Sequence, residues 1–185
     1  MTKLFCLATG LCLMLACNDK PAETTPPVDS AVVVKETKAP PQSEIGDAKF
    51  TEIGKRAMAN LSSGDIDKWM NDFADNASYR WSAGDSLVGK AAITKYWKER
   101  RGKIIDSLTY TNDIWLPLKV NTPQKGPDLA GNWLLGWSQV SAKYKNGKKL
   151  TYWVHVDYHF DASDKIDLVL TYIDRAPINR ALGVK

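Results

Sequence analysis

Two histidines and one aspartate lie close together in the chain, within the segment Tyr152–Phe160. No other histidine occurs among the 185 residues. Alternate residues of a β-strand point to the same face, so His155 and Asp157 would be neighbours on one face. Such a pair could act as an imidazole base oriented by a carboxylate, or could supply two ligands to a metal ion. His159 would lie about 13 Å from His155 at ~3.3 Å per residue, so the three side chains cannot share one ion.

The same segment also has the alternation of a strand that is buried on one side only. One face would carry the apolar or aromatic residues Tyr152, Val154, Val156, Tyr158 and Phe160. The other face would carry Thr151, Trp153, His155, Asp157 and His159. An alternating strand normally turns its apolar face to the core, so we expect the polar face outside, exposed or at a dimer contact. We expect no metal site, because no nearby cysteine or glutamate completes a set of ligands.

The first 16 residues have the organisation of a bacterial export signal. Lys3 precedes an uncharged apolar run from Leu4 to Ala16, which is too short to span a bilayer as a finished helix. The run ends in "LMLAC", which resembles the lipobox of bacterial lipoproteins. On that resemblance, Cys17 is acylated and becomes the mature N-terminus. The alternative is a plain signal peptide that is cleaved near Ala16.

The segment that follows Cys17 predicts a flexible tether. Residues 17–45 contain five of the nine prolines and scattered Thr, Ser, Glu and Lys, so they cannot bury enough apolar surface to offset the entropy of ordering. All three cysteines lie at or before residue 17, so the remaining domain, residues 46–185, has no disulfide and no cysteine nucleophile. We therefore expect a domain in the bacterial cell envelope, held to a membrane by a lipid at Cys17, either at the outer membrane or facing the periplasm.

Charge and short motifs exclude two classes of partner. Residues 46–185 contain 21 Lys and Arg against 16 Asp and Glu, a net charge of +5 without a continuous basic stripe. We therefore expect no nucleic-acid partner. The segment Gly84–Ala91 comes within one residue of a phosphate-binding P-loop, but Ala91 stands where Ser or Thr would hold magnesium, and no parallel βαβ pattern surrounds it. We therefore expect no nucleotide and no other cofactor.

The order of periodic segments indicates an α+β fold. Residues 48–65, 65–77 and 89–102 place apolar side chains at helical spacing, with Asp65 as the N-cap of the second helix. A short strand is expected after the second helix, near residue 78. Segments 107–118, 131–145, 149–161 and 165–175 have the period of two, and Asn146-Gly147 favours a hairpin turn between the second and third of them. Three N-terminal helices packed on one face of a curved antiparallel sheet are the expected architecture.

Several motifs in this order resemble one known superfamily. "SSGDIDKWMNDFADNASYRW", "GKAAITKYW", "VDYHFDASDKI" and "YID" together resemble the nuclear transport factor 2-like superfamily, in its SnoaL-like branch, over residues 48–176. The resemblance implies a cone of three helices wrapped by a strongly bent sheet, with a pocket at the open end, and often a dimer. The superfamily includes ketosteroid isomerases, polyketide cyclases, dehydratases and non-enzymatic binding domains, so the resemblance does not decide the function.

The resemblance also implies where catalytic residues would lie. The isomerase general base falls on Trp81 and the isomerase tyrosine falls on Ala57, and neither residue can perform the required proton chemistry. The third isomerase residue, a protonated aspartate, falls on Val156, or on Asp157 after a slip of one residue. For a cyclase, only Asp157 or Asp85 is a candidate for the acidic group in the pocket.

Aromatic residues predict the walls of the pocket. The candidates are Tyr79, Trp81, Trp97, Trp115, Trp137 and Tyr152, with Tyr172 and Asp174 at the rim. We expect a small apolar or aromatic ligand, or a protein partner, bound without catalysis. The alternatives are an enzyme of the cyclase, dehydratase or isomerase type that uses His155 or Asp157, and a structural homodimer whose interface includes Trp153 and His159.

Overall fold

The computed structural model describes residues 39–126 and 128–184. The predicted signal peptide, Cys17 and most of the predicted tether lie outside the described residues. Inside the predicted tether, Ser43–Ile45 form the short strand β1, which pairs with β4 from Ser43 opposite Val120 to Ile45 opposite Leu118. The folded domain therefore begins before residue 46, because an edge of the sheet supplies hydrogen-bond partners to this segment.

The three predicted helices are present. α1 spans Lys49–Ser63 and ends where Gly64 adopts the left-handed conformation, with φ of 84°. α2 spans Ile66–Met70, and the Asp65 side chain accepts a hydrogen bond from the backbone N–H of Lys68, which confirms the predicted N-cap. α3 spans Lys90–Lys103 and carries Arg100, Arg101 and Lys103 in its last turn, where cations favour the helix dipole.

The second helix is shorter than predicted. The prediction extended it through residue 77, but it ends at Met70, and Phe73 begins strand β2, which spans Phe73–Trp81. Phe73 pairs with Ile166, and Tyr79 pairs with Val169, in a parallel ladder. Long-range pairing with a buried strand thus outweighs the helical periodicity of this stretch.

Besides β1, two elements were not predicted from the sequence. β3 spans Ser86–Val88 and pairs with β2, and α4 spans Ala176–Leu182 after the last strand. Pro177 in the first turn of α4 suits a helix start, and Gly183, with φ of 71°, ends the helix. No helix in the described part of the chain is long and apolar enough to cross a membrane.

The four long C-terminal strands lie close to their predicted positions. They are β4 (Ile105–Val120), β5 (Gly131–Tyr144), β6 (Lys149–Phe160) and β7 (Ile166–Tyr172). The sheet has the order β1-β4-β5-β6-β7-β2-β3, and all neighbouring pairs are antiparallel except β2 and β7. The register of β4 shifts between Thr111 and Ile114, where Asn112 has a φ of 56°. Such a bulge increases the local twist and helps the sheet to bend.

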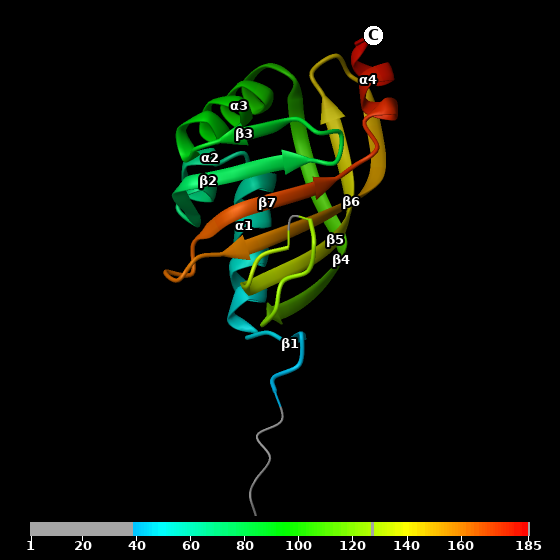
Figure 1. The fold of residues 1–185 in the computed structure, drawn as a ribbon. Coiled ribbons are helices and arrows are strands. Elements are labelled where there is room, and N and C mark those ends of the chain that lie inside the picture. The colour runs from blue at the N-terminus through cyan, green and yellow to red at the C-terminus, as the bar shows by residue number, and fades with distance from the viewer. Residues whose placement is uncertain (1–38, 127, 185) are drawn as a thin grey trace, which may run out of the picture. The chain divides into compact units, whose positions relative to one another are not determined.

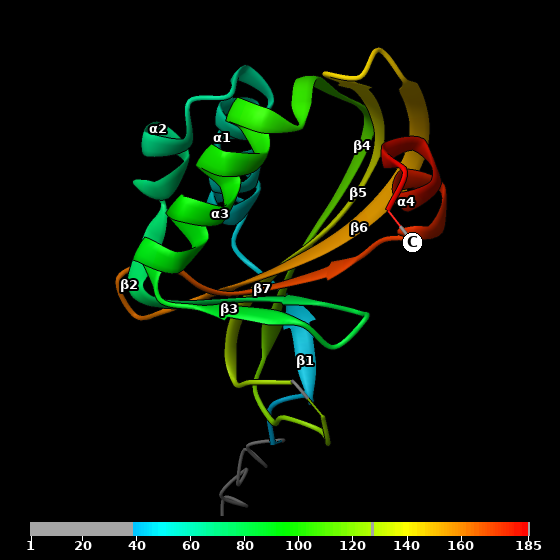
Figure 2. The same ribbon diagram turned by 90° about the horizontal axis from the view of Figure 1, so that it is seen from above.

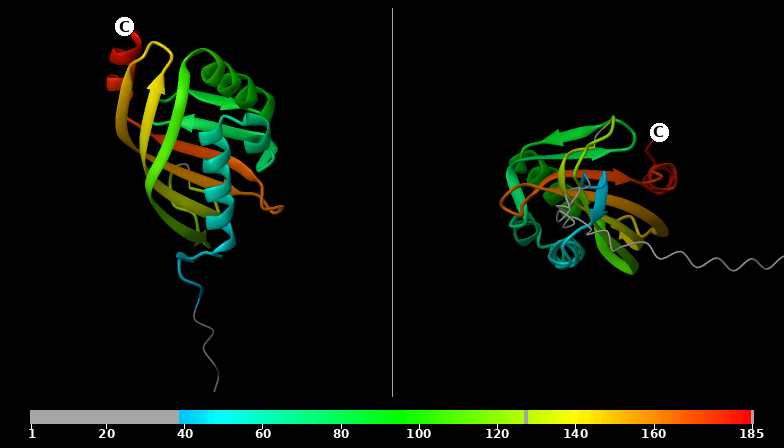
Figure 3. Two further views of the ribbon diagram at one scale, coloured as in Figure 1. Left: turned by 180° about the vertical axis from the view of Figure 1, so that it is seen from behind. Right: turned by 60° about the horizontal axis from the view of Figure 1, so that its bottom comes forward.

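The sheet is strongly bent, so it has one face that turns toward the helices and an opposite face that turns away from them. Figure 1 shows α1, α2 and α3 on one side of the sheet, and Figure 2 shows α4 across from them, beyond the end of β7. Figure 3 shows α1 lying along β4 when the molecule is seen from behind. We call the face toward the helices the concave face and the opposite one the convex face. The main core fills the space between the helices and the concave face, and its buried side chains include Phe50, Trp69, Phe73, Tyr158, Phe160 and Ile166.

Strand β6 has the predicted orientation. Val156, Tyr158 and Phe160 are buried in the core of the concave side, and the ring of Phe160 lies 4.4 Å from that of Phe50 in α1. His155, Asp157 and His159 alternate with them and therefore point to the convex face. The prediction that the apolar face of this strand turns toward the helices is confirmed.

Candidate functional site

The concave face and the helices enclose a cavity of about 290 Å³. Its walls come from α1, α2, α3, α4, the concave side of β2 and β4–β7, and the segment after β7. The lining residues are Met58, Leu61, Trp69, Tyr79, Trp81, Tyr96, Trp97, Arg100, Ile104, Ile105, Leu108, Tyr110, Val140, Tyr152, Val154, Val156, Tyr158, Thr171, Ile173, Arg175, Ile178, Asn179, Leu182 and Val184. Most of these side chains are aromatic or aliphatic, so the cavity suits a molecule with an apolar body.

Tyrosine hydroxyls are the main polar groups inside the cavity. Burial is the largest cause that raises the pKa of Tyr79, Tyr110, Tyr152 and Tyr158, so all four phenols keep their protons at neutral pH. The Thr171 hydroxyl donates a hydrogen bond to the Tyr79 oxygen at 2.9 Å, which leaves the Tyr79 O–H group free to donate. The cavity thus offers neutral hydrogen-bond donors and no phenolate base.

Two arginines are the charged groups of the cavity wall. Arg100, near the end of α3, lies over the ring of Tyr96, 5.5 Å from its centroid. Arg175, between β7 and α4, lies 5.1 Å from the centroid of the Trp81 ring, and its guanidinium donates to a carboxylate oxygen of Asp85 at 2.9 Å. This hydrogen bond is the largest cause that lowers the pKa of Asp85. Asp85 itself is not among the lining residues.

Four of the predicted wall residues line the cavity and three do not. Tyr79, Trp81, Trp97 and Tyr152 are in the wall. Trp115 packs in the core on the concave side, over Gly136, where a side chain on the glycine would collide with the indole. Trp137 and Tyr172 pair across the strands with His155, so both point to the convex face. Asp174, predicted at the rim, accepts a hydrogen bond from the N–H of Ala176 at the start of α4.

His155 and Asp157 lie together on the convex face, outside the cavity. The His155 ring is stacked between Trp137, at 4.4 Å, and Tyr172, at 5.3 Å. Its Nδ1 lies 3.0 Å from the carbonyl oxygen of Gly136, which can only accept, so Nδ1 donates. Its Nε2 lies 2.9 Å from Oδ1 of Asp157, but the approach is not aligned for a hydrogen bond, and Oδ1 has no other partner. Burial is the largest cause that raises the pKa of Asp157, and His155 opposes it.

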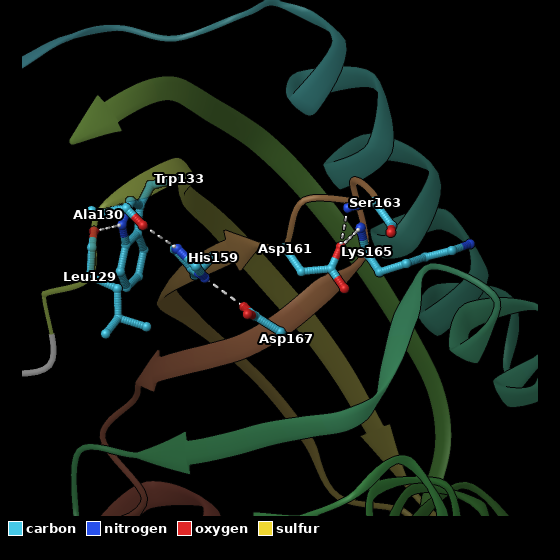
Figure 4. Close-up of polar contacts among 8 residues, drawn as sticks. All are labelled: Leu129, Ala130, Trp133, His159, Asp161, Ser163, Lys165 and Asp167. Atoms are coloured by element: carbon cyan, nitrogen blue, oxygen red, sulfur yellow. Dashed lines mark hydrogen bonds and ion pairs between the residues drawn. The ribbon is translucent and has the colours of Figure 1, made fainter. Parts of the chain in front are cut away.

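His159 fastens a loop to the convex face (Figure 4). Its Nδ1 lies 2.6 Å from a carboxylate oxygen of Asp167 on β7, and its Nε2 lies 3.1 Å from the carbonyl oxygen of Ala130. The indole N–H of Trp133 donates to the carbonyl oxygen of Leu129 at 2.8 Å, which fastens the same loop at a second point. In the adjoining turn between β6 and β7, Asp161 accepts hydrogen bonds from the backbone of Ser163 and Lys165. The two ring contacts, to Asp167 and Ala130, give His159 a structural role.

Among the described residues, the cavity wall has no side chain that could act as a general base near neutral pH. No aspartate, glutamate, histidine, lysine or cysteine is among the residues that line it in the described chain. Trp81 lines the cavity and Ala57 is buried in the core, at the two positions where an isomerase would need its base and its tyrosine. Within residues 39–126 and 128–184, no group of three His, Cys, Asp or Glu side chains is arranged to hold a metal ion.

Several residues of the cavity wall were not predicted from the sequence. Tyr158 shares a strand face with Val154 and Val156, so the alternation of β6 could have placed it there. Tyr110 and Arg100 gave no such signal, because the bend of β4 and the position of α3 bring them to the cavity. Ile178 and Leu182 come from α4, and the prediction ended before that helix.

Similarity to known proteins is found at the level of structure. No protein-family model matches the sequence, and no curated protein shows significant similarity to it. A protein from Xanthomonas campestris provisionally named a polyketide cyclase superimposes with a TM-score of 0.59 and 12% identity, covering 72% of this chain and 96% of that chain. A nuclear transport factor 2-like protein of unknown function from Burkholderia pseudomallei gives a TM-score of 0.56 and 10% identity, over 73% and 98% of the two chains.

A third solved structure has a bound small molecule. It is a hypothetical protein with a ketosteroid isomerase-like fold from Catenulispora acidiphila, in complex with trimethylamine. It superimposes with a TM-score of 0.54 and 13% identity, over 72% of this chain and 94% of that chain. At such identities the likeness concerns the fold alone. The helices, the strand order and these neighbours show that the chain has the nuclear transport factor 2-like fold.

Proposed function

We propose that this protein is a lipid-anchored component of the bacterial cell envelope that binds a small, mostly apolar molecule in its cavity without transforming it. The observation that carries the proposal is the cavity of about 290 Å³, whose wall is largely aromatic and aliphatic and contains no carboxylate or imidazole. An apolar cavity of about 150 Å³ is large enough for benzene. A body of one or two rings is therefore the expected size of ligand.

An enzyme that uses His155 or Asp157 is the alternative. Both residues are partly buried on the convex face, with 24% and 13% of their side-chain surface exposed, and the sheet separates them from the cavity. Catalysis by them would need a substrate on the convex face, beside Trp137 and Tyr172. Binding in the cavity without chemistry needs no such second site, so we favour it.

Native mass spectrometry tests the main proposal. The protein purified from its host is expected to retain a small molecule, and Val154→Trp is expected to lose it, because Val154 lines the cavity and a larger side chain there occupies the ligand's space. Thr151→Trp is the matched control, since it introduces the same side chain at an exposed position on the other face of β6. Equal retention by both variants would show that the molecule binds elsewhere.

Self-association through the convex face is a second candidate function. Ile114, Leu116, Trp153 and Tyr172 expose between 37% and 57% of their surface on this face. Several exposed apolar side chains on one face favour a protein contact. Light scattering at high protein concentration is expected to show a dimer that Trp153→Lys dissociates, and a wild-type protein that remains monomeric would exclude this function.

A further inference from the structure

We infer that the ligand of this cavity is a monocarboxylate: an apolar body of one or two rings, or of similar size, with one carboxylate group bound by Arg100 at the opening. This inference rests on the proposed binding function and specifies the class of ligand. It depends on which charges face the cavity, where they lie relative to its apolar part, and how far each is already neutralised.

Both charged side chains in the wall are cationic and lie at its more accessible end. Arg100 and Arg175 are partly exposed, whereas Tyr79 and Tyr158, deeper in the cavity, expose only 5% and 2% of their surface. A ligand with an anionic end would therefore place that end toward the opening and its apolar part among the buried aromatic rings. The reverse orientation would bury a charge among side chains that cannot neutralise it.

Arg100 has no carboxylate partner of its own among the residues that the structure describes. Its contact is with the face of the Tyr96 ring, which leaves the edge of the guanidinium available. Its positive charge lowers the pKa of the Tyr79 and Tyr152 hydroxyls, although burial outweighs this effect, so the charge acts on the interior of the cavity. A guanidinium has donors only, and its planar edge matches the two oxygens of a carboxylate.

Arg175 already has a carboxylate partner. Its guanidinium lies 2.9 Å from Oδ2 of Asp85, whose side chain is 52% exposed. Among the described residues that line the cavity, Arg100 therefore carries the one positive charge without a carboxylate partner. A single negative charge on the ligand balances it, which favours a monocarboxylate over a dianionic phosphate ester. An exposed ion pair of this kind contributes little stability, so a bound carboxylate can compete with Asp85 for Arg175.

The tyrosine hydroxyls are consistent with the same ligand class. Protonated phenols donate hydrogen bonds to any acceptor on the ligand, such as an ether, carbonyl or second carboxylate oxygen. No base in the wall removes a proton from the ligand. The wall therefore binds a carboxylate without providing a group to transform it.

Isothermal titration calorimetry with two matched probes tests this inference on the purified full chain. Naphthalene-2-carboxylate and naphthalene-2-carboxamide have nearly the same shape and differ in charge. We expect the carboxylate to bind about tenfold more tightly, as one charge-assisted hydrogen-bonded pair typically contributes. Arg100→Gln is expected to remove this preference, so that the two probes bind with nearly equal affinity. Arg80→Gln, which removes the same charge from an exposed position outside the cavity wall, is the matched control and is expected to keep the preference.

Asp85→Asn is expected to change the affinity for the carboxylate probe in the opposite direction. Removing the carboxylate that occupies Arg175 is expected to raise the affinity for naphthalene-2-carboxylate severalfold, with no change for the amide. A variant that merely damaged the fold would weaken both probes. Equal affinity of the wild-type protein for the two probes would overturn the inference and leave the proposed apolar binding intact, whereas binding of neither probe would overturn both.

Discussion

At the scale of single residues, the close packing of the concave face depends on Gly136. A Cβ atom at this position would collide with the indole ring of Trp115, which lies directly over the strand. The position is paired with Val156 on one side and Trp115 on the other, so the collision would fall inside the core. The absence of a side chain is therefore what admits the tryptophan.

Gly136→Ala and Gly102→Ala are expected to change stability in opposite directions. The first forces Trp115 to move and should lower the free energy of unfolding by roughly 1–3 kcal/mol. Gly102 lies within α3 with open space around its Cβ position, so alanine there should raise the free energy of unfolding by about 0.5–1 kcal/mol. Urea denaturation measures both. A neutral Gly136→Ala variant would contradict the packing described for Trp115.

Asp157 is a residue whose ionisation opposes folding. Its native pKa is raised above the ordinary value of 3.8, mainly by burial. The stability that comes from the protonated form of Asp157 is therefore fully present below pH 3.8. It is lost as the pH rises through the raised native pKa. At neutral pH the protein must keep a partly buried carboxylate that lies 2.9 Å from Nε2 of the His155 ring.

We therefore expect Asp157→Asn to stabilise the protein at pH 7 by roughly 1–2 kcal/mol, because the amide carries no charge to desolvate. The gain should shrink as the pH falls, because the raised pKa of Asp157 favours the neutral carboxyl group in the folded protein. Denaturation curves at pH 4 and pH 7 measure it, and Asp113→Asn, an exposed position, is the control. A loss of stability at pH 7 would mean that the pair with His155 outweighs the cost of burial.

At the scale of elements, residues 128–130, which precede β5, are held against the convex face by side-chain contacts from β5 and β6. His159 joins Ala130 to Asp167, and Trp133 donates to Leu129. Beneath them lies a small apolar cluster of Val120, Trp133, Leu168 and Leu170. Gly131, with φ of 124°, allows the chain to pass close to the His159 ring, which a Cβ atom would approach to 3.0 Å.

His159→Ala is expected to release this loop. Losing both ring contacts should cost roughly 2–3 kcal/mol of stability, and amide hydrogen exchange should rise within residues 128–130 while β5 and β6 stay protected. Trp133→Phe, which removes the bond to Leu129 but keeps both ring contacts of His159, should produce a smaller rise in the same amides. Unchanged exchange in His159→Ala would show that the apolar cluster alone holds the loop.

At the scale of the whole molecule, the proposed anchor determines where the cavity operates. Cys17→Ser removes the sulfur that acylation requires, and the variant is expected to move from the membrane fraction to the soluble fraction of the cell envelope. Fractionation followed by metabolic labelling with palmitate measures both effects, and Cys12→Ser is the matched control because it lies before the predicted cleavage site. Membrane retention of the Cys17 variant would contradict lipid anchoring.

Local patterns in the sequence predicted most helices and strands of this protein and the orientation of strand β6. Apolar spacing predicted α1 and α3, Asp65 predicted the start of α2, and alternation predicted that Val154 and Val156 face the helices. These predictions succeed because helical and strand periods repeat every few residues and require no knowledge of distant partners. Phe73 shows the limit, since pairing with Ile166 decided its conformation.

Only the tertiary structure decided which aromatic residues form the cavity. Trp81 and Trp137 are equally plausible wall residues in the sequence, but strand register places the second beside His155 on the convex face, and a shift of one residue would reverse the result. The same holds for Arg100 in α3, for Arg175 after β7 and for the residues of α4, which the tertiary structure brings together in the cavity wall. The sequence therefore determined that the domain has a cavity lined by aromatic residues. Long-range strand register and sheet bending decided which charged residues line it.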